Sequence, residues 1–375
     1  MKKTIFTLVT LAFLGLSTTY AQGVGIGTTD PHASSILDVE STEKGFLPPR
    51  MTQTERDNIS NPAEGLIIYN TTAECLQWYN GITWFDGCGN TPIAATGGVV
   101  NDVTINGKDY RVHTFEDSGT FEVLAYGEVS AGEIDYLIVG GGGSGGIAGP
   151  FGGGGGGGAG GFVEGTTNLS IGSYTITVGD GGASVAANHT AGNEGEDSEA
   201  FGITAVGGGR GGSGNTGTGG GGPASDGGSG GGVGTIAGSI ALPGIGAGTP
   251  GQGNDGGNAI PPCGGGGGGA GAPGGTPPNI STAANGGDGL ASSITGSPVF
   301  YAGGGAGGGP TSNGNGAIAI SPAIGNGGTG GGGGFGATDG EDGKGGGGSA
   351  GLTNGTPSGN GGKGVVIIRY PLSHP

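Results

Sequence analysis

The residues that could carry out chemistry are few and scattered along this chain of 375 residues. Four acidic residues lie close together between positions 194 and 199, but a general acid or base also needs a desolvating pocket. With only 32% hydrophobic residues, the chain is a poor source of such a pocket. The histidines share no catalytic or metal-ligating spacing and stand at positions 32, 113, 189 and 374. We therefore expect no enzymatic activity.

Acidic loops could instead hold a hard cation. Three carboxylates stand within residues 339–343, and oxygen ligands of this kind suit calcium. The fragments 253–257 and 285–290 resemble parts of calcium-binding nonapeptide repeats, but they lack the tandem register that such sites need. The simpler interpretation is a set of solvated acidic turns. We expect neither a metal site nor a cofactor, with calcium as the one alternative.

The charge balance argues against nucleic acid as a partner. The chain holds 29 acidic and 11 basic residues, which gives a formal net charge of -18. A phosphate-binding surface needs clustered lysine and arginine, which this composition does not provide. Glycine motifs of the dinucleotide type recur because glycine is abundant, and none has the helix and acidic residue that nucleotide binding requires.

Binding without catalysis is better supported, by polar loops and by aromatic residues. Polar loops separate the glycine tracts, and loops on a rigid base commonly carry recognition. The candidate binding residues in these loops are Asn188, His189, Asp255, Asn258 and Asn313. A second candidate surface, suited to stacking on a sugar or a partner, consists of Trp78, Tyr79 and Trp84. The alternative for these aromatic residues is the core of a small module, because aromatic side chains dominate burial in small domains.

Two cysteines flank the same aromatic residues. The pair Asn80-Gly81 between Cys75 and Cys88 is turn-like, and strand-like runs joined by Asn-Gly predict a β-hairpin. Such a hairpin would bring the two sulfur atoms together. We predict a disulfide, with two unpaired thiols as the alternative. Cys263 follows two prolines and has no evident partner.

The first 21 residues predict export. Lys2 and Lys3 precede a mostly apolar stretch at 5–16, and the segment ends in small or neutral residues, as a secretory signal peptide does. The stretch is shorter than the roughly 20 apolar residues of a membrane span, and no later segment qualifies. We expect cleavage before Gln22 and a secreted or extracellular protein, with association to the outer cell surface left open. An uncleaved anchor is the alternative.

Residues 22–90 have a nearly ordinary composition and form the first predicted module. Its strand-like runs predict a small β-meander and lie at 66–70, 76–79 and 82–85. The string from 23 to 89 resembles the N-terminal module of secreted, tail-fibre-like surface proteins of Bacteroidota, most clearly at 45–51 and 65–70. Relatives often use such segments in trimeric shafts that end in a self-cleaving chaperone domain. The resemblance implies a homotrimer, whereas the lack of a recognisable chaperone domain at the C-terminus argues against one.

Residues 91–98 predict a linker, and residues 99–375 predict a glycine-rich domain within a chain that holds 106 glycines. A collagen triple helix is excluded because glycine does not occupy every third position. Disorder is one alternative, since ordering glycine costs the most backbone entropy and buries almost no apolar surface. Against disorder stand apolar, strand-like runs between the tracts, at 136–139, 174–178 and 365–370.

A third interpretation accounts for both the tracts and the strands. Glycine tracts can lie in extended polyproline-II-like helices, which make no internal hydrogen bonds and must bond to neighbours when they are buried. Without side chains, the backbones approach closely enough to do so. We predict a mainly β fold: a small N-terminal β-meander, followed by a glycine-rich β-sandwich with bundled polyglycine-II-like helices.

The strands that flank the tracts carry a second resemblance. Residues 114–121, 136–143, 172–179 and 364–371 are similar to the bacterial and phage glycine-rich domain. The layout is also similar to that of phage tail-tip adhesins and of the glycine-rich region of anaplastic lymphoma kinase-type receptors. This resemblance covers about residues 110–371 and implies a β-sandwich joined to a polyglycine helix bundle.

Together these observations predict a secreted or cell-surface, non-enzymatic, adhesin-like binding protein. The N-terminal module would be its base, and the glycine-rich scaffold would present loops to a surface ligand, with a glycan as one candidate. The alternative is a structural component of the extracellular matrix, or a spacer, whose glycine-rich region is largely flexible. Ice binding is a weaker option.

Overall fold

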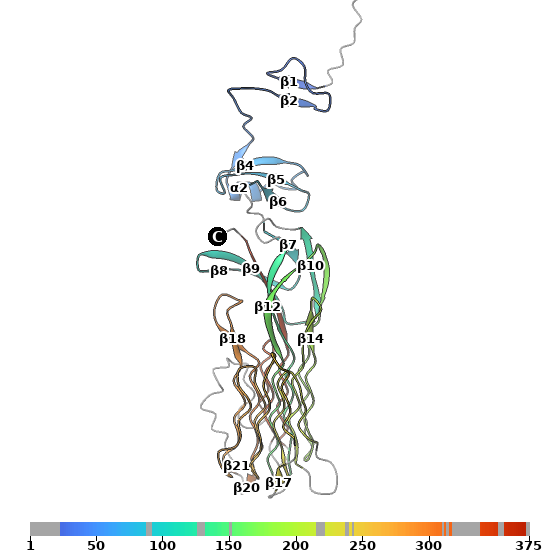
Figure 1. Cartoon of the computed structure of the whole chain (residues 1–375), viewed down its shortest axis with the longest axis vertical. Coiled ribbons are helices and arrows are strands. Elements are labelled where there is room, and N and C mark those ends of the chain that lie inside the picture. The colour runs from blue at the N-terminus through green and yellow to red at the C-terminus, as the bar shows by residue number, and fades with distance from the viewer. Residues whose placement is uncertain are drawn as a thin grey trace, which may run out of the picture. The chain divides into compact units, whose positions relative to one another are not determined.

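The structure is a computed structural model of the chain (Figure 1). It describes residues 23–87, 92–125, 132–149, 152–214, 222–236, 240–241, 244–309, 311–312, 315–316, 338–351 and 356–372. These residues are mainly β, as the sequence predicts, with many short strands and little helix. Two compact units can be distinguished, residues 1–61 with 67–77 and residues 62–66 with 78–375. None of the helices in the described ranges is long and apolar enough to cross a bilayer.

The N-terminal part of the chain contains two sheets. The first is a parallel pair of β1 (Val24–Ile26) and β2 (Leu37–Val39). The elements that follow are β3 (Arg50–Met51), α2 (Gln53–Asp57), β4 (Ile67–Asn70), β5 (Cys75–Tyr79) and β6 (Trp84–Asp86). Their strands form one sheet in the order β3-β4-β5-β6. β4, β5 and β6 fall on the three strand-like runs of the sequence and are neighbours in chain order, as in a meander.

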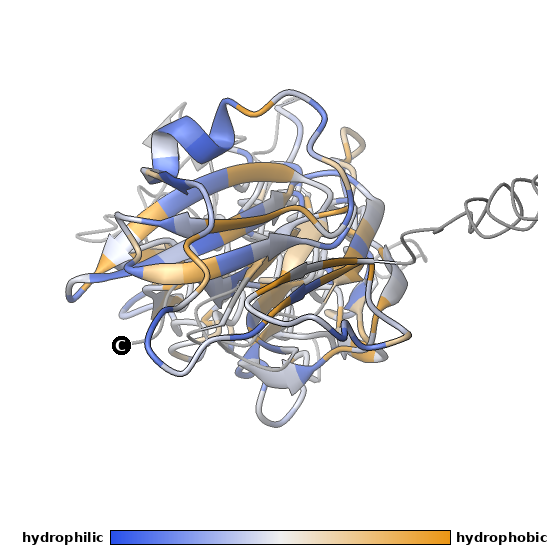
Figure 2. Ribbon diagram, turned by 90° about the horizontal axis from the view of Figure 1, so that it is seen from above, coloured by the Kyte–Doolittle hydropathy of each residue, from blue (hydrophilic) through white to orange (hydrophobic). Residues whose placement is uncertain are grey.

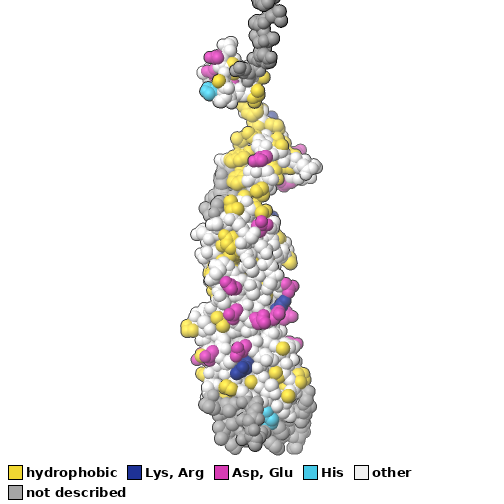
Figure 3. All heavy atoms as spheres, turned by 90° about the vertical axis from the view of Figure 1, so that its right-hand side faces the viewer, with side chains coloured by type: hydrophobic (Ala, Val, Ile, Leu, Met, Phe, Trp, Pro, Cys, Tyr) yellow, Lys and Arg dark blue, Asp and Glu magenta, His cyan; other side chains and the backbone are white. Residues whose placement is uncertain are grey.

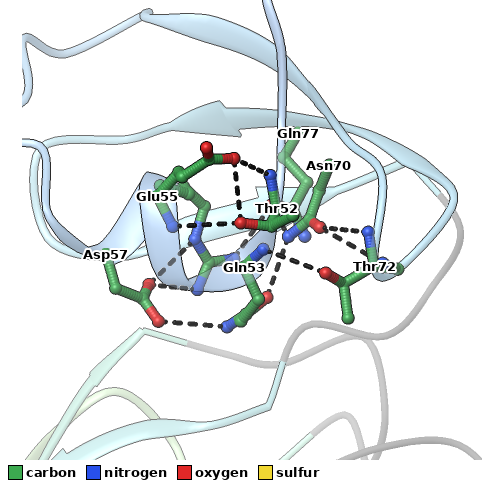
Figure 4. A network of polar contacts seen from close by, with 9 residues as sticks. Thr52, Gln53, Glu55, Asp57, Asn70, Thr72 and Gln77 are labelled. Carbon is green, nitrogen blue, oxygen red and sulfur yellow. Dashed lines mark hydrogen bonds and ion pairs between the residues drawn. The ribbon is translucent and has the colours of Figure 1, made fainter.

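Helix α2 is short and polar, and it begins at a capping box. The Thr52 hydroxyl accepts a hydrogen bond from the amide of Glu55, and the Glu55 carboxylate accepts one from the amide of Thr52. The helix is hydrophilic along its length and has no buried residue (Figure 2). Hydrogen bonds fix it to the sheet: the Asn70 amide donates to the side-chain oxygen of Gln53 (2.8 Å) (Figure 4), and the Arg56 guanidinium donates to that of Gln77 (2.9 Å).

The second unit contains two facing sheets. Their strands are β7 (Ala94–Thr96), β8 (Val99–Ile105), β9 (Lys108–Phe115), β10 (Gly119–Ala125), β11 (Glu133–Val139), β12 (Phe162–Asn168), β13 (Gly172–Ile176) and β22 (Val365–Pro371). One sheet has the order β12-β11-β22-β9-β8, and the other has the order β13-β10-β7. β7 lies inside the stretch 91–98 that the sequence predicts as a linker, and it pairs with β10. Part of that stretch therefore belongs to a sheet.

Short hairpins accompany the two sheets. They are β14 (Ser198–Ala200) with β15 (Ile203–Ala205), β16 (Thr235–Ile236) with β17 (Ile240–Ala241), β18 (Leu290–Ser292) with β19 (Val299–Tyr301), and β20 (Thr311–Ser312) with β21 (Asn315–Gly316). Figure 1 shows β14 and β18 beside the sheets, and β17, β20 and β21 at the opposite end of the glycine tracts. The tracts thus connect a sandwich at one end to turns at the other.

The apolar core lies on both faces of the five-stranded sheet. Ile138 of β11 and Ile368 of β22 pack in a cluster between the two sheets, together with Phe121 of β10. Their chain neighbours Leu137 and Ile367 belong to a second cluster, on the side of the β18–β19 hairpin. A strand that is buried on both faces has a nearly continuous apolar sequence. This explains the nearly continuous apolar runs in β11 and β22.

Extended glycine tracts run side by side away from the sandwich (Figure 1). The tract at 152–161 is hydrogen-bonded through its backbone to six others. Its amides donate to tracts at 206–212, 265–268 and 345–348. Its carbonyl groups accept from tracts at 140–146, 229–235 and 305–308. The tract 152–161 is therefore enclosed by backbone on all sides, and we call it the central tract.

The hydrogen bonds of the central tract repeat every three residues. Gly155 donates to Gly212 (2.8 Å), and Gly158 donates to Gly209 (2.8 Å). Residues three apart on one tract therefore bond to residues three apart on the next. The two amides between them donate to two other tracts. Buried amides and carbonyls are thus satisfied in several directions, as buried backbone requires.

No side chain fits at the middle of the central tract. A Cβ on Gly156 would lie 2.0 Å from the carbonyl oxygen of Gly305, and a Cβ on Gly157 would lie 2.1 Å from that of Gly143. Real Cβ atoms essentially never approach another heavy atom within 3.0 Å. Close approach of the backbones, rather than an unusual φ angle, is what requires glycine here.

Candidate ligand-presenting surface

The turn at residues 186–190 carries two of the predicted binding residues. Asn188 is exposed, and His189 is half-buried with a φ of 61°, which is uncommon outside glycine. The Nδ1 atom of His189 lies 2.8 Å from the carbonyl oxygen of Gly214. Its ring also covers Gly149, where an added Cβ would approach the ring to 1.9 Å. His189 therefore holds two tracts together, and Asn188 is the freely exposed member of the pair.

Asp255 and Asn258 are exposed and lie on a different tract. The Asp255 carboxylate accepts a hydrogen bond from the amide of Gly248 (2.9 Å), which ties this tract to a neighbour. The Asn258 side chain accepts one from the next amide along the chain (2.9 Å). Asn313 lies outside the described residues. Among the residues that the structure does describe, no hydrogen bond joins Asp255 or Asn258 to Asn188.

The predicted aromatic surface consists of two ring pairs. Tyr79 and Trp84 have ring centroids 5.5 Å apart with an interplanar angle of 56°, and both are half-buried. Trp78 stacks on Phe85 at 6.1 Å and is exposed. Tyr79 and Trp84 thus contribute to packing between β5 and β6. Trp78 keeps a surface that another ring or a sugar could contact.

Two of the three cysteines, Cys75 and Cys263, are described, and both are buried. Cys75 is buried on β5 and is disulfide-bonded. Cys88 lies outside the described residues, and its pairing with Cys75 stays a prediction. Cys263 is a free thiol with no exposed surface, and burial raises its pKa. Because the thiolate is the reactive form, a raised pKa makes Cys263 a poor nucleophile.

A hollow of about 440 Å³ opens beside the β14–β15 hairpin, where no site is expected from the sequence. Phe201 and Gly202 form the hairpin turn, with φ angles of 58° and 74°. The Phe201 ring packs against those of Tyr174 (5.6 Å) and Phe121 (6.3 Å). The hollow is lined by Thr167, Asn168, Leu169, Ser170, Ser173, Tyr174, Thr175, Glu199, Phe201 and Gly202. The pair Phe201-Gly202, which stands between two short strand-like runs, is the sequence signal that could have located this turn.

In each of the two acidic segments, 194–199 and 339–343, a carboxylate bonds to a basic side chain or to the backbone. In the run 194–199, Glu194 pairs with Arg210 at 3.7 Å. In the loop 339–343, the Asp339 carboxylate accepts a hydrogen bond from a backbone amide of the next tract (2.7 Å). Within the described ranges, no three acidic, histidine or cysteine side chains are grouped closely enough to hold a metal ion.

The buried His113 connects Gly97, which lies just before Gly98 and β8, with the last strand, β22. His113 on β9 has its Nδ1 atom 2.7 Å from the carbonyl oxygen of Gly97, and its Nε2 atom 3.0 Å from the hydroxyl of Tyr370. A neutral imidazole can donate to the first and accept from the second. Burial lowers the pKa of His113 and raises that of Tyr370 to about 12. These groups are fixed in the core and serve its structure.

Two family models match the chain. Residues 25–101 match a model described as a phage tail like trimerisation region, in agreement with the tail-fibre-like resemblance of the sequence. Residues 116–371 match a model described as a glycine-rich domain. A comparison with curated proteins gave no match. Because the second family model spans about two thirds of the sequence, the chain belongs to the glycine-rich domain family.

Proposed function

We propose that the protein is a secreted or cell-surface adhesin without enzymatic activity, whose glycine-rich region is a stiff scaffold for exposed turns. The observation that carries the proposal is the central tract, bonded to six neighbouring tracts. Such a tract cannot bend without breaking hydrogen bonds on several sides. The turns at the ends of the tracts therefore keep fixed positions, and loops on rigid scaffolds commonly carry recognition.

The hydrogen-bond period supports a polyglycine-II-like geometry for the tracts. A polyproline-II helix has three residues per turn, so every third residue points to the same neighbour. Gly155 and Gly158 follow this rule, since both donate to the tract 206–212. A largely flexible spacer, the alternative function, does not predict such a repeat.

A neutral glycan is the ligand class that fits the exposed chemistry best. The turn at 186–190 offers the amide of Asn188, and the hollow beside β14–β15 offers hydroxyl, amide and carboxylate groups around the rings of Tyr174 and Phe201. Sugars combine polar edges with apolar faces, and they are bound by such mixed linings. The net charge of -18 disfavours an anionic polysaccharide.

The N-terminal module completes the proposal as an assembly base. Its match to a phage tail like trimerisation region supports a role in joining copies of the chain. The signal-peptide-like first 21 residues support export, and export would place the scaffold where surface glycans occur.

The test is binding of the labelled full chain to a printed array of neutral glycans. We expect retention on a subset of sugars, and at least a tenfold loss for Asn188→Ala, because Asn188 is exposed and its truncation leaves the tracts intact. Asn101→Ala, an equal change at an exposed position of β8, is the matched control. His189→Ala is not a clean test because its ring supports two tracts. Binding by Asn188→Ala at the level of the unaltered chain would argue against this turn, and an array without any bound sugar would argue against glycan recognition.

A further inference from the structure

Exposed apolar side chains are concentrated in the N-terminal module. Of the 18 large apolar side chains that are exposed in the described ranges, 11 lie between Val24 and Ile82. Only 5 lie beyond Val100, although that part of the chain is several times longer. Figure 3 shows hydrophobic side chains gathered over the module, and smaller, scattered groups of them on the same face of the glycine-rich region. Large exposed apolar patches mark interaction surfaces.

The parallel pair β1–β2 has one fully apolar face. Side chains alternate across a strand, and the register pairs Val24 with Leu37 and Ile26 with Val39. These four side chains therefore share a face, and each is 43–57% exposed. Parallel sheets are normally buried on both faces, and an isolated two-stranded sheet is marginal in water. The pair needs a partner that covers this face.

The sheet β3-β4-β5-β6 also leaves apolar side chains open. On β4 and β5, Ile67 and Leu76 are 46% and 44% exposed. The opposite face is covered and contains two polar amides, Asn70 and Gln77. The Asn70 amide donates hydrogen bonds to the side-chain oxygens of Gln77 and of Gln53 on α2 (Figure 4). The single chain thus buries an amide network while larger apolar side chains face solvent. This distribution is expected when a second chain packs on the open face.

We propose that the apolar faces of β1–β2 and of β4–β5 form the seam between three copies of this chain, and that the glycine-rich regions stay outside it. The inference rests on the assembly role proposed above, and it names the residues that perform it. The match of residues 25–101 to a trimerisation region selects copies of the chain as the occupant. Three identical apolar faces bury one another around a closed axis, so no face is left open.

The described part of the glycine-rich region beyond Val100 exposes few large apolar side chains. Beyond Val99 and Val100 on β8, the exposed ones are spread singly along the sequence: Ile171, Ile245, Ile260, Ile280 and Leu290. Single exposed apolar residues are normal on a protein surface. The acidic charge of the chain also opposes close packing between copies. The assembly would therefore carry three separate scaffolds, each with its own set of turns.

Light scattering coupled to size-exclusion chromatography tests the seam on the full chain. We expect three times the mass of one chain, which is 35.1 kDa from the sequence. Leu37→Lys and Leu76→Lys should each lower the measured mass about threefold, because a buried lysine without a partner is not tolerated. Ile280→Lys makes the same change at a side chain that is 63% exposed, and should leave the mass unchanged.

Hydroxyl-radical footprinting of the unaltered chain gives a second readout that does not depend on a variant folding. In the assembly, Leu37 and Leu76 should be protected, whereas Ile280 should be oxidised freely. A single-chain mass, equal oxidation of all three side chains, or dissociation by Ile280→Lys would overturn the seam. A trimer that binds no sugar would support the seam and argue against the adhesin function. A monomer that binds sugar would support the adhesin function and overturn the seam.

Discussion

Replacing one glycine of the central tract should open the bundle, and Gly157→Ala is the sharpest case. The new Cβ would lie 2.1 Å from the carbonyl oxygen of Gly143. The tract 140–146 would have to move by about 0.9 Å to reach even 3.0 Å, the shortest separation that real Cβ atoms show. That tract donates to the central tract through Gly143 and Gly146, both at 2.9 Å. The same movement would stretch both bonds beyond hydrogen-bonding distance.

The cost follows from these two losses. Overpacking in a dense interior costs about 1–3 kcal/mol. Two stretched backbone hydrogen bonds cost about 1 kcal/mol each, and more if their groups stay buried without partners. We expect a destabilisation of about 3–5 kcal/mol, a large fraction of the roughly 5–15 kcal/mol that stabilises a typical domain. Since about 1.4 kcal/mol corresponds to a factor of ten, amides of the central tract should exchange at least 100-fold faster.

Amide hydrogen exchange read by mass spectrometry on peptides covering 152–161 is the right assay. Tryptophan fluorescence is a poor reporter of this change, because the two tryptophans of the chain, Trp78 and Trp84, lie on β5 and β6 and not in the glycine tracts. Gly119→Ala on β10 is the matched control, since its Cβ would lie 3.5 Å from the nearest atom, an ordinary contact. It should be neutral, or stabilising by less than about 1 kcal/mol. Unchanged exchange in the central tract of Gly157→Ala would refute the reasoning.

Three further predictions concern buried polar groups. Lowering the pH from 7 to 5 should destabilise the sandwich, because burial lowers the pKa of His113 in the folded chain. In the unfolded chain this histidine takes up a proton near pH 6.5, whereas in the folded chain it stays neutral. In chemical denaturation, His113→Gln should flatten this part of the pH dependence of the unfolding free energy. Ser229→Ala should be neutral or stabilising, since the Ser229 hydroxyl is buried without a hydrogen-bond partner. Ser144→Ala should lower the free energy of unfolding by about 1–3 kcal/mol, because the Ser144 hydroxyl accepts a hydrogen bond from the Asn193 amide (2.8 Å). Denaturation midpoints of the two variants measure this difference in stability. Cys263 should react with iodoacetamide only as fast as the domain unfolds, and mass spectrometry of the native chain would reveal faster labelling.

The strands were predictable from the sequence because their apolar patterns depend only on local order. β11 and β22 are continuous apolar runs, and the two-faced burial of Leu137 and Ile138 shows why. Alternation at 174–178 likewise predicted β13. Membership of the glycine-rich domain family was also predictable, because the sequences of the flanking strands are more specific to that family than glycine runs are. Export and an origin among Bacteroidota stay predictions.

The packing of the tracts was not predictable from the sequence. Every tract has nearly the same composition, so nothing local says that 152–161 is central or which six tracts surround it. The same uniformity hid the role of His189, which looked like a free binding residue but covers Gly149 and bonds to Gly214. The hollow at Phe201 was missed because a type I′-like turn more often carries Asn-Gly than an aromatic residue.

Chain topology explains how such uniform tracts reach one arrangement. Glycine tracts gain little from apolar burial, so their pairing needs to be imposed by elements that do. β22, the last strand, lies between β11 and β9 at the middle of the five-stranded sheet. β11 comes before the first tract and β22 follows the last one, so the sheet closes only when every tract lies between fixed ends. The register of the apolar strands, Val139 with Val365 for example, then sets the register of the glycines that follow and precede them. The specificity of the scaffold thus resides in the strands, and the glycine tracts are free to be repetitive.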